Sequence, residues 1–206
     1  MILSLLDLDL GSPSVRQAFR NCQDLHRNIM KAFDTGRNEA KVLYRMVRSE
    51  KKVQIYVQSM AEPHWERIEE YGFHCVKCKD ISKLPESFRT DQILHFSLFC
   101  CPAKKVSGDG KKNSRRVIIR GEEAQLAWLK RQGERNGFLI LESHINGKGE
   151  ILSGSKPSGD FCIAGVPVEG VLQIKDVEAF RTTFVNGIGA EKAYGFGMLM
   201  INKYES

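Results

Sequence analysis

The feature that most constrains this 206-residue sequence is an order of strand-like and helix-like segments that occurs twice. Strand-like segments alternate apolar and polar residues, whereas helix-like segments carry apolar residues at helical spacing. In the N-terminal half the order is strand, helix, strand, strand, helix, strand, at residues 1–10, 13–33, 42–48, 53–59, 64–71 and 73–79. This order predicts a split βαβ, or ferredoxin-like, unit with an open four-stranded sheet.

The C-terminal half repeats the order, with expected segments at residues 92–100, 122–133, 138–145, 168–174, 177–184 and 196–202. We therefore predict an α+β protein of two tandem ferredoxin-like (RRM-like) domains, at residues 1–88 and 89–206. Such sheets often serve as platforms for RNA. The interval 146–167 is expected to be a long loop, and loops of that length are usually functional or disordered.

Four glycines lie within eleven residues near the C-terminus: Gly187, Gly189, Gly195 and Gly197. A dinucleotide-binding loop needs a strand before its glycines and a helix after them, and here the order is reversed. Gly187 is expected to end a helix in the left-handed conformation, with Gly195 and Gly197 on one face of the last strand. These glycines either allow close packing or leave a bare strip beside Lys192 that admits a phosphate backbone.

The formal net charge of +6 favours an anionic partner. Basic residues gather in two expected loops, and either loop is a nucleic-acid contact or simply a solvated surface. The candidate RNA-binding residues are Arg115, Arg116, Lys148, Lys156 and Lys192, together with the four glycines. No apolar run approaches the roughly 20 residues that span a bilayer, and the first ten residues lack the cationic start of a signal peptide. We expect a cytoplasmic protein with no membrane partner.

The cysteines and histidines do not predict a metal site. Cys75 and Cys78 form a single CxxC pair without a second pair, which is a weak zinc signal compared with reduced structural thiols. No two histidines have metal-ligand helical spacing. We expect neither a metal nor a cofactor.

Several segments, in order along the chain, resemble the CasE family, the precursor-RNA endonuclease of the type I-E CRISPR system. They are Leu25-His26, the run 101–105 (CPAKK), the run 123–129 (EAQLAWL), the run 169–174 (EGVLQI) and the glycine-rich run 187–199. The glycine-rich run alone indicates only the broader superfamily of repeat-associated RNA-processing proteins.

The resemblance implies metal-independent cleavage of CRISPR precursor RNA within the repeat, at the base of its hairpin. It also implies retention of the product RNA with the other subunits of the type I-E surveillance complex. The residue that matches the family's catalytic histidine is His26. The family often has a tyrosine three residues earlier, where this sequence has Gln23.

Metal-free RNA cleavage uses the ribose 2′-hydroxyl as nucleophile, and histidine can move a proton near neutral pH. By helical position His26 lies on the apolar side of its helix, which favours a core histidine unless that face opens into a cleft between the halves. Arg27 and Lys31, on the adjacent basic edge, either hold the scissile phosphate or are solvated cations. Because of Gln23, a non-cleaving subunit that binds the RNA hairpin stays as the alternative function.

Overall fold

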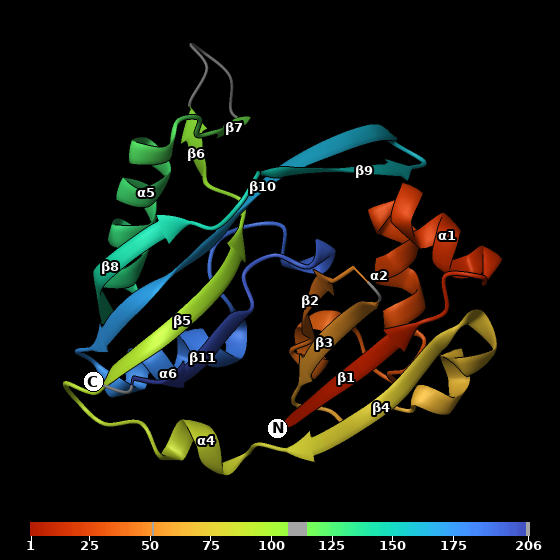
Figure 1. The fold of residues 1–206 in the computed structure, drawn as a ribbon, viewed down its shortest axis with the longest axis horizontal. Coiled ribbons are helices and arrows are strands. Elements are labelled where there is room, and N and C mark those ends of the chain that lie inside the picture. The colour runs from red at the N-terminus through yellow and green to blue at the C-terminus, as the bar shows by residue number, and fades with distance from the viewer. Residues whose placement is uncertain (51, 107–114, 205–206) are drawn as a thin grey trace.

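The computed structural model describes residues 1–50, 52–106 and 115–204, which form two sheets side by side, each with helices packed on it (Figure 1). The first half contains β1 (Ile2–Leu8), α1 (Pro13–Arg20), α2 (Cys22–Met30), α3 (Arg37–Ala40), β2 (Leu43–Arg48), β3 (Val53–Ser59), the 3₁₀ helix η1 (Trp65–Tyr71) and β4 (Phe73–Asp80). Its sheet has the order β2-β3-β1-β4, and neighbouring strands are antiparallel.

The second half follows a linker with the short helix α4 (Lys83–Glu86). Its elements are β5 (Ile93–Cys100), β6 (Ala103–Val106), β7 (Arg115–Ile118), α5 (Glu122–Arg135), β8 (Phe138–Ile145), β9 (Glu150–Lys156), β10 (Gly159–Ile174), α6 (Val177–Asn186), the 3₁₀ helix η2 (Lys192–Tyr194) and β11 (Leu199–Lys203). The second sheet has the order β11-β5-β10-β8. When the strands are numbered within their own half, this is the order of the first sheet read from the opposite edge, and the first strand of each half lies second from one edge. The predicted tandem ferredoxin-like fold is confirmed.

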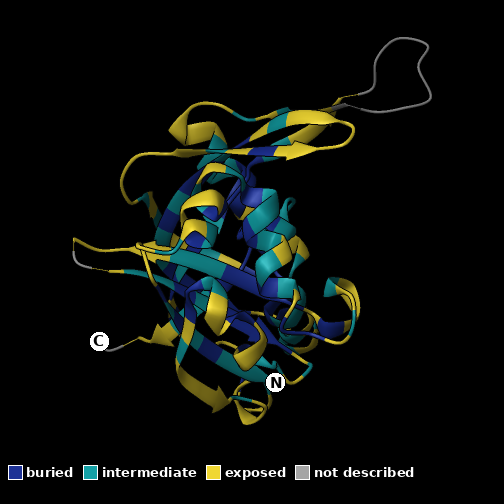
Figure 2. Cartoon of the chain, turned by 90° about the vertical axis from the view of Figure 1, so that its right-hand side faces the viewer, coloured by how far each residue is buried: buried dark blue, intermediate teal, exposed yellow. Residues whose placement is uncertain are grey.

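Each half has its own hydrophobic core, and Figure 2 shows that buried residues are concentrated inside the halves whereas the outlying hairpins are exposed. Fully buried side chains such as Leu6 and Ile29 fill the first core, and Leu98 and Phe180 fill the second. Phe88, from the linker, packs in the second core. The predicted domain boundary after residue 88 stays a prediction. No helix among the described residues is both long and apolar enough to cross a membrane.

The helix expected over residues 13–33 is wrong in one respect, because the chain forms two helices, α1 and α2. Asn21 breaks the run: its backbone is extended, with φ −138° and ψ 104°, and its side-chain oxygen accepts a hydrogen bond from the Gln23 amide at 3.0 Å. An asparagine in this conformation is a helix N-cap. The helix that carries His26 therefore starts afresh at Cys22 and ends at Met30.

The interval 146–167 is mostly a hairpin, not the long loop that the sequence predicts. β9 pairs antiparallel with the first half of β10, and Figure 1 shows this hairpin reaching over α1 and α2. Phe161 and Ile163 of β10 pack in a small core with Cys22 of α2 and Tyr194 and Phe196 of the glycine-rich segment. The alternation of residues within one segment cannot predict such a contact between the two halves.

The placement of Gly195 and Gly197 in the last strand is also wrong. Both have positive φ, 89° and 83°, outside the region of regular strands, and β11 begins only at Leu199. Gly187 ends α6 with positive φ as expected, but its ψ of 168° lies outside the left-handed helical region. The centre of the basic segment, residues 107–114, lies outside the described residues, while its flanks pair as the β6–β7 hairpin.

Candidate active site

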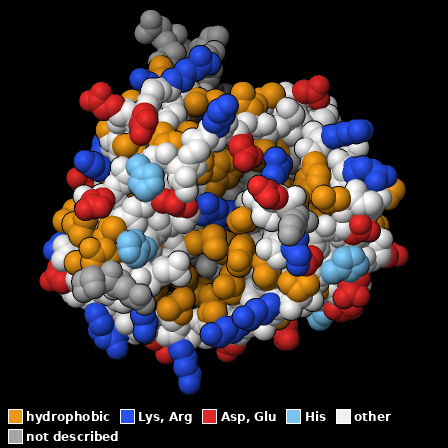
Figure 3. Space-filling view, viewed as in Figure 1, with side chains coloured by type: hydrophobic (Ala, Val, Ile, Leu, Met, Phe, Trp, Pro, Cys, Tyr) orange, Lys and Arg blue, Asp and Glu red, His pale blue; other side chains and the backbone are white. Residues whose placement is uncertain are grey.

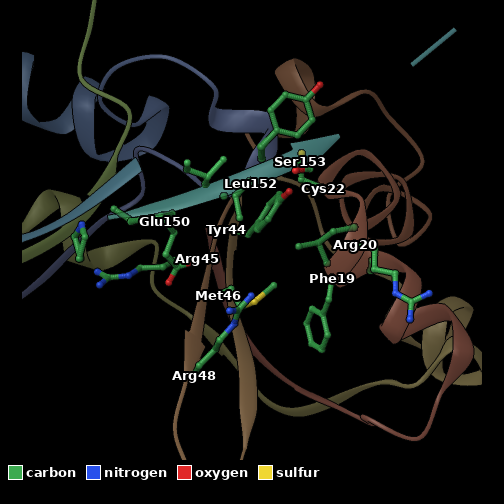
Figure 4. Close-up of a pocket in the computed structure, with 17 residues that line it drawn as sticks. Phe19, Arg20, Cys22, Tyr44, Arg45, Met46, Arg48, Glu150, Leu152 and Ser153 are labelled. Atoms are coloured by element: carbon green, nitrogen blue, oxygen red, sulfur yellow. The ribbon is translucent and has the colours of Figure 1, made fainter. Parts of the chain in front are cut away.

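A cavity of about 690 Å³ lies between the halves, and elements from both line it (Figure 4). α2 contributes Cys22 and Leu25, β2 contributes Tyr44, and β9 contributes Leu152, with Tyr194 from η2. The space-filling view shows that hydrophobic side chains also gather in the hollow between the halves on the face of Figure 1 (Figure 3). Cavities at such junctions are common binding sites, because two bodies supply side chains to one space.

His26 lies on α2 at this junction and is half-buried. Its ring meets the Tyr194 ring edge to face, with 6.2 Å between centroids, so that the helix face carrying His26 contacts the second half. The buried Nδ1 atom has no hydrogen-bond partner in the described part of the chain. Buried polar atoms without partners are rare, and a functional role is one of the reasons for which they occur. His26 is not itself among the residues that line the cavity.

Burial lowers the pKa of the His26 imidazole, and the positive charges of Arg37, Lys156 and Arg27 lower it further. These cations come from α3, β9 and α2, so that the fold, and not one helix, assembles them. The imidazole is consequently neutral at pH 7, the form that accepts a proton. Three cations around one half-buried group also create a field that favours an anion.

Lys156 and Tyr194 connect the hairpin to α2. The Lys156 ammonium lies 5.0 Å from the Phe161 ring centroid and 5.4 Å from that of Tyr194, and hydrogen bonding to Tyr194 raises the pKa of this ammonium. The Tyr194 hydroxyl donates to Gln23 Oε1 at 2.9 Å. A phenol from the second half therefore contacts the residue that stands where the family often has tyrosine.

The structure separates the other two predicted catalytic residues. Arg27 is exposed, pairs with Asp24 at 3.2 Å, and is one of the cations that act on His26. The Lys31 ammonium instead lies 3.6 Å from the centre of the Tyr71 ring and is not among the charges that shift the His26 pKa. The charge of Arg27 thus acts on His26, whereas the Lys31 side chain packs on Tyr71 within the first half.

The predicted RNA-binding cations lie at different places. Lys148 is exposed between β8 and β9, and Arg116 pairs with Glu191 at 3.1 Å. Arg115 is in β7 beside residues outside the described part of the chain. Lys192 is half-buried in η2, where burial and the charges of Arg37 and Lys41 lower its pKa.

The glycines pack the corner between the halves. Gly187, Gly195 and Gly197 are buried, and Gly189 is half-buried. A Cβ on Gly187 would lie 2.8 Å from the Gly197 carbonyl oxygen and 3.0 Å from the Leu43 side chain of β2. Close backbone approach therefore accounts for the glycine at Gly187, and a role of the four glycines in RNA binding stays a prediction.

Sequence reasoning missed Arg37, Lys41 and Tyr194. Arg37 and Lys41 lie at the two ends of a four-residue helix that carries no motif, and Tyr194 lies within the glycine-rich run, where only the glycines and Lys192 drew attention. No periodicity or spacing places α3 beside α2 and η2. The signal for these three residues is purely spatial.

We expect Arg37→Gln to raise the pKa of His26 toward its ordinary value of about 6.5, because removing a nearby cation stabilises the imidazolium. The pKa stays below that value since burial persists. NMR titration of the His26 ring measures the shift. Lys31→Gln is the matched control and leaves the His26 pKa unchanged, because the Lys31 ammonium lies over Tyr71. An equal shift in both variants contradicts the assignment of Arg37.

Metal-ligating side chains do not converge: among the described residues, no three His, Cys, Asp or Glu side chains form a group that could hold a metal ion. All six cysteines are free thiols. The groups that surround the candidate site are thus a histidine, cations, a phenol and an amide.

The fold and the site define a class of protein with two ferredoxin-like halves and, at their junction, a histidine whose pKa is lowered by nearby cations. The chain belongs to the CRISPR-associated protein family, whose model matches residues 1–203. The endoribonuclease Cse3 of Thermus thermophilus is 28% identical over 216 residues, which cover 98% of this chain and 99% of the relative. The resemblance to the CasE family is confirmed.

Solved structures agree with this placement. The structure of Thermus thermophilus Cse3 bound to an RNA representing a pre-cleavage complex has a TM-score of 0.84 and 26% identity. The match covers 98% of this chain and 100% of that chain. The crystal structure of Cas6e from Escherichia coli has a TM-score of 0.74 and 23% identity, covering 99% and 100% of the two chains, and it shows the same fold.

Proposed function

We propose that this protein is a metal-independent endoribonuclease that cleaves CRISPR precursor RNA within the repeat, at the base of its hairpin. It acts in the cytoplasm and retains the mature guide RNA for the type I-E surveillance complex. Family membership supports this proposal, as do the names of the Thermus relative, an endoribonuclease, and of its RNA-bound structure.

The observation that carries the proposal is the environment of His26. It is half-buried at the junction, its Nδ1 atom has no hydrogen-bond partner among the described residues, and burial and three cations lower its pKa. A neutral imidazole accepts the proton of the ribose 2′-hydroxyl, whose oxygen forms a bond to the adjacent phosphorus. The bond from phosphorus to the 5′-oxygen breaks, the leaving oxygen takes a proton from water, and a 2′,3′-cyclic phosphate remains. General base assistance of this kind contributes roughly 10²–10⁴-fold in rate.

The cations around His26 are proposed to stabilise the negative charge that develops on the scissile phosphate. Negative charge builds on the phosphate oxygens during attack, and fixed positive charges stabilise it more in a partly buried site than in water. Arg37, Lys156 and Arg27 occupy that role. Lys31 lies over Tyr71, so we assign it no part in the chemical step.

Binding of the RNA stem rests mainly on phosphate contacts, because an A-form stem hides its base edges in a deep, narrow groove. The exposed cations Lys148, Lys156 and Arg116 are the proposed contacts, together with Arg115 of β7. Lys192 and the glycine corner line the proposed path toward His26. The β9–β10 hairpin reaches over α2, so stem and histidine meet on the same side of the molecule (Figure 1).

The test is incubation with the protein's own repeat RNA in excess EDTA. We expect one cut in the repeat, a 2′,3′-cyclic phosphate on the upstream product, and no cut when the nucleotide before the cut is 2′-deoxy. Gel analysis with mass spectrometry of the ends reads all three outcomes. Cutting of the deoxy RNA, or cutting that EDTA abolishes, contradicts the mechanism.

The non-cleaving alternative gives a different result in the same experiment, namely tight binding of the repeat without any product. Gln23 is the feature that favours this alternative. The hydrogen bond from the Tyr194 hydroxyl to Gln23 counts against it, because a phenol is still present beside α2.

A further inference from the structure

A second, smaller pocket lies where the first half meets the end of α6. Its volume is about 150 Å³, and it is lined by Arg37, Asn38, Lys41, Leu43, Val185, Asn186 and Lys192. Three of these side chains are cations, two are amides, and none is acidic. The pocket therefore offers hydrogen-bond donors and positive charge in one small space.

The positive charge in this pocket is not neutralised within the described part of the chain. Arg37, Lys41 and Lys192 take part in none of the ion pairs that the described residues form. Glu191, the sequence neighbour of Lys192, is held by Arg116 at 3.1 Å. Burial lowers the pKa of Lys192, and the like charges of Arg37 and Lys41 lower it further.

Local structure positions two of these cations at the pocket. Lys41 follows α3 in the left-handed conformation, with φ 52°, which is common for the residue after a helix. Arg37 donates to Asn38 Oδ1 at 2.6 Å and to the Val42 carbonyl at 3.4 Å. The pocket therefore brings these positive charges together before any anion is bound.

The 3₁₀ helix η2 connects this pocket with His26. Lys192, at the start of η2, lines the pocket, and Tyr194, at its end, meets the His26 ring edge to face with 6.2 Å between centroids. The pocket therefore lies near the proposed position of the scissile phosphate, and the charge of Arg37 lowers the pKa of both His26 and Lys192. A polynucleotide carries a phosphate at every nucleotide, so a chain held at His26 brings a neighbouring phosphate within reach of the pocket.

We propose that the pocket of Arg37, Lys41 and Lys192 binds one backbone phosphate of the repeat RNA that flanks the scissile phosphate. This inference rests on the proposed function. It adds a positioning site: fixing the flanking phosphate aligns the 2′-hydroxyl with the phosphorus it attacks, and such alignment is needed for reaction.

The test combines a charge-removing double variant, Lys41→Gln with Lys192→Gln, and an uncleavable repeat RNA that is 2′-deoxy at the cut. In this RNA, single deoxynucleotide methylphosphonate linkages replace the phosphates near the cut one at a time. With the unaltered protein, neutralising one flanking phosphate weakens binding about tenfold, a loss typical of one charge-assisted contact. The double variant binds the unmodified RNA about tenfold more weakly, and the same neutral linkage then causes no further loss.

The salt dependence gives an independent measure. Each phosphate contact to a single strand adds about 0.7 to the slope of log K against log salt concentration. We expect the double variant to lose about that much slope, and Lys83→Gln, at an exposed lysine of α4 that does not line the pocket, to lose none. Circular dichroism melts confirm that each variant is folded.

Two outcomes overturn the inference. In the first, the neutral linkage and the double variant weaken binding additively, so the pocket does not hold that phosphate. In the second, RNA binding is unchanged and only assembly with other proteins fails, which makes the pocket a protein-docking site. If the unaltered protein neither binds nor cuts the repeat, the proposed function is wrong. This result differs from both outcomes above, in which the unaltered protein still binds the RNA.

Discussion

His26→Ala is expected to abolish cleavage of the repeat RNA while leaving binding of that RNA intact. The loss in single-turnover rate is about 10²–10⁴-fold, the contribution of a positioned general base. Binding persists because the cations that act on His26, from α2, α3 and β9, are unchanged. Single-turnover cleavage and filter binding of the uncleavable RNA separate the two effects.

The matched control is His74→Ala, since His74 is an exposed histidine on β4, away from the cavity. We expect it to cut at the unaltered rate. A pH profile adds a second check: the unaltered protein loses rate as pH falls through the lowered pKa of His26, because protonation removes the base. If His26→Ala cuts normally, or loses binding and cleavage in parallel, His26 is not the catalytic base.

Gly197→Ala is expected to destabilise the whole protein. The new Cβ would lie 2.3 Å from the Ile188 carbonyl oxygen, at a backbone φ of 83°. The segment cannot move away, because the Gly197 amide donates to Phe99 O at 2.7 Å and its carbonyl accepts from the Ile188 amide at 2.8 Å. Positive φ and overpacking together cost about 2–4 kcal/mol, and the melting temperature falls by roughly 5–15 °C.

Gly147→Ala measures the cost of positive φ without the steric clash, so the difference between the two variants gives the steric part. Gly147 also has positive φ, 96°, but a Cβ there meets nothing within 4 Å. We expect a loss of about 1 kcal/mol, the cost of the backbone conformation alone. Thermal melts of both variants measure the difference. Equal losses would mean that the corner at Gly197 has room for a side chain and does not fix the two halves together.

Much of the fold could be predicted because alternation and helical spacing are local properties. The order of strands and helices, the two cores and the ferredoxin-like units follow from which residues must be buried. The break at Asn21 was also readable in principle, because Asn21 precedes a helix that has Asp24 in its first turn. The β9–β10 hairpin was not, because Cys22 and Tyr194, which lie far away in sequence, cover its apolar side chains.

The candidate site divides in the same way. In the sequence, helical position favours a core histidine at His26, and the resemblance to the CasE family makes it the proton-transfer candidate. The glycine-rich run after the last helix is evident from the residues themselves. The packing of the two halves sets which charges act on that histidine. Arg37 and Lys156 do so, whereas the Lys31 ammonium, five residues after His26, lies over the Tyr71 ring. Burial and helical position are encoded by neighbours along the chain, but an electrostatic field depends on distances between elements, and these are set by how the two halves pack.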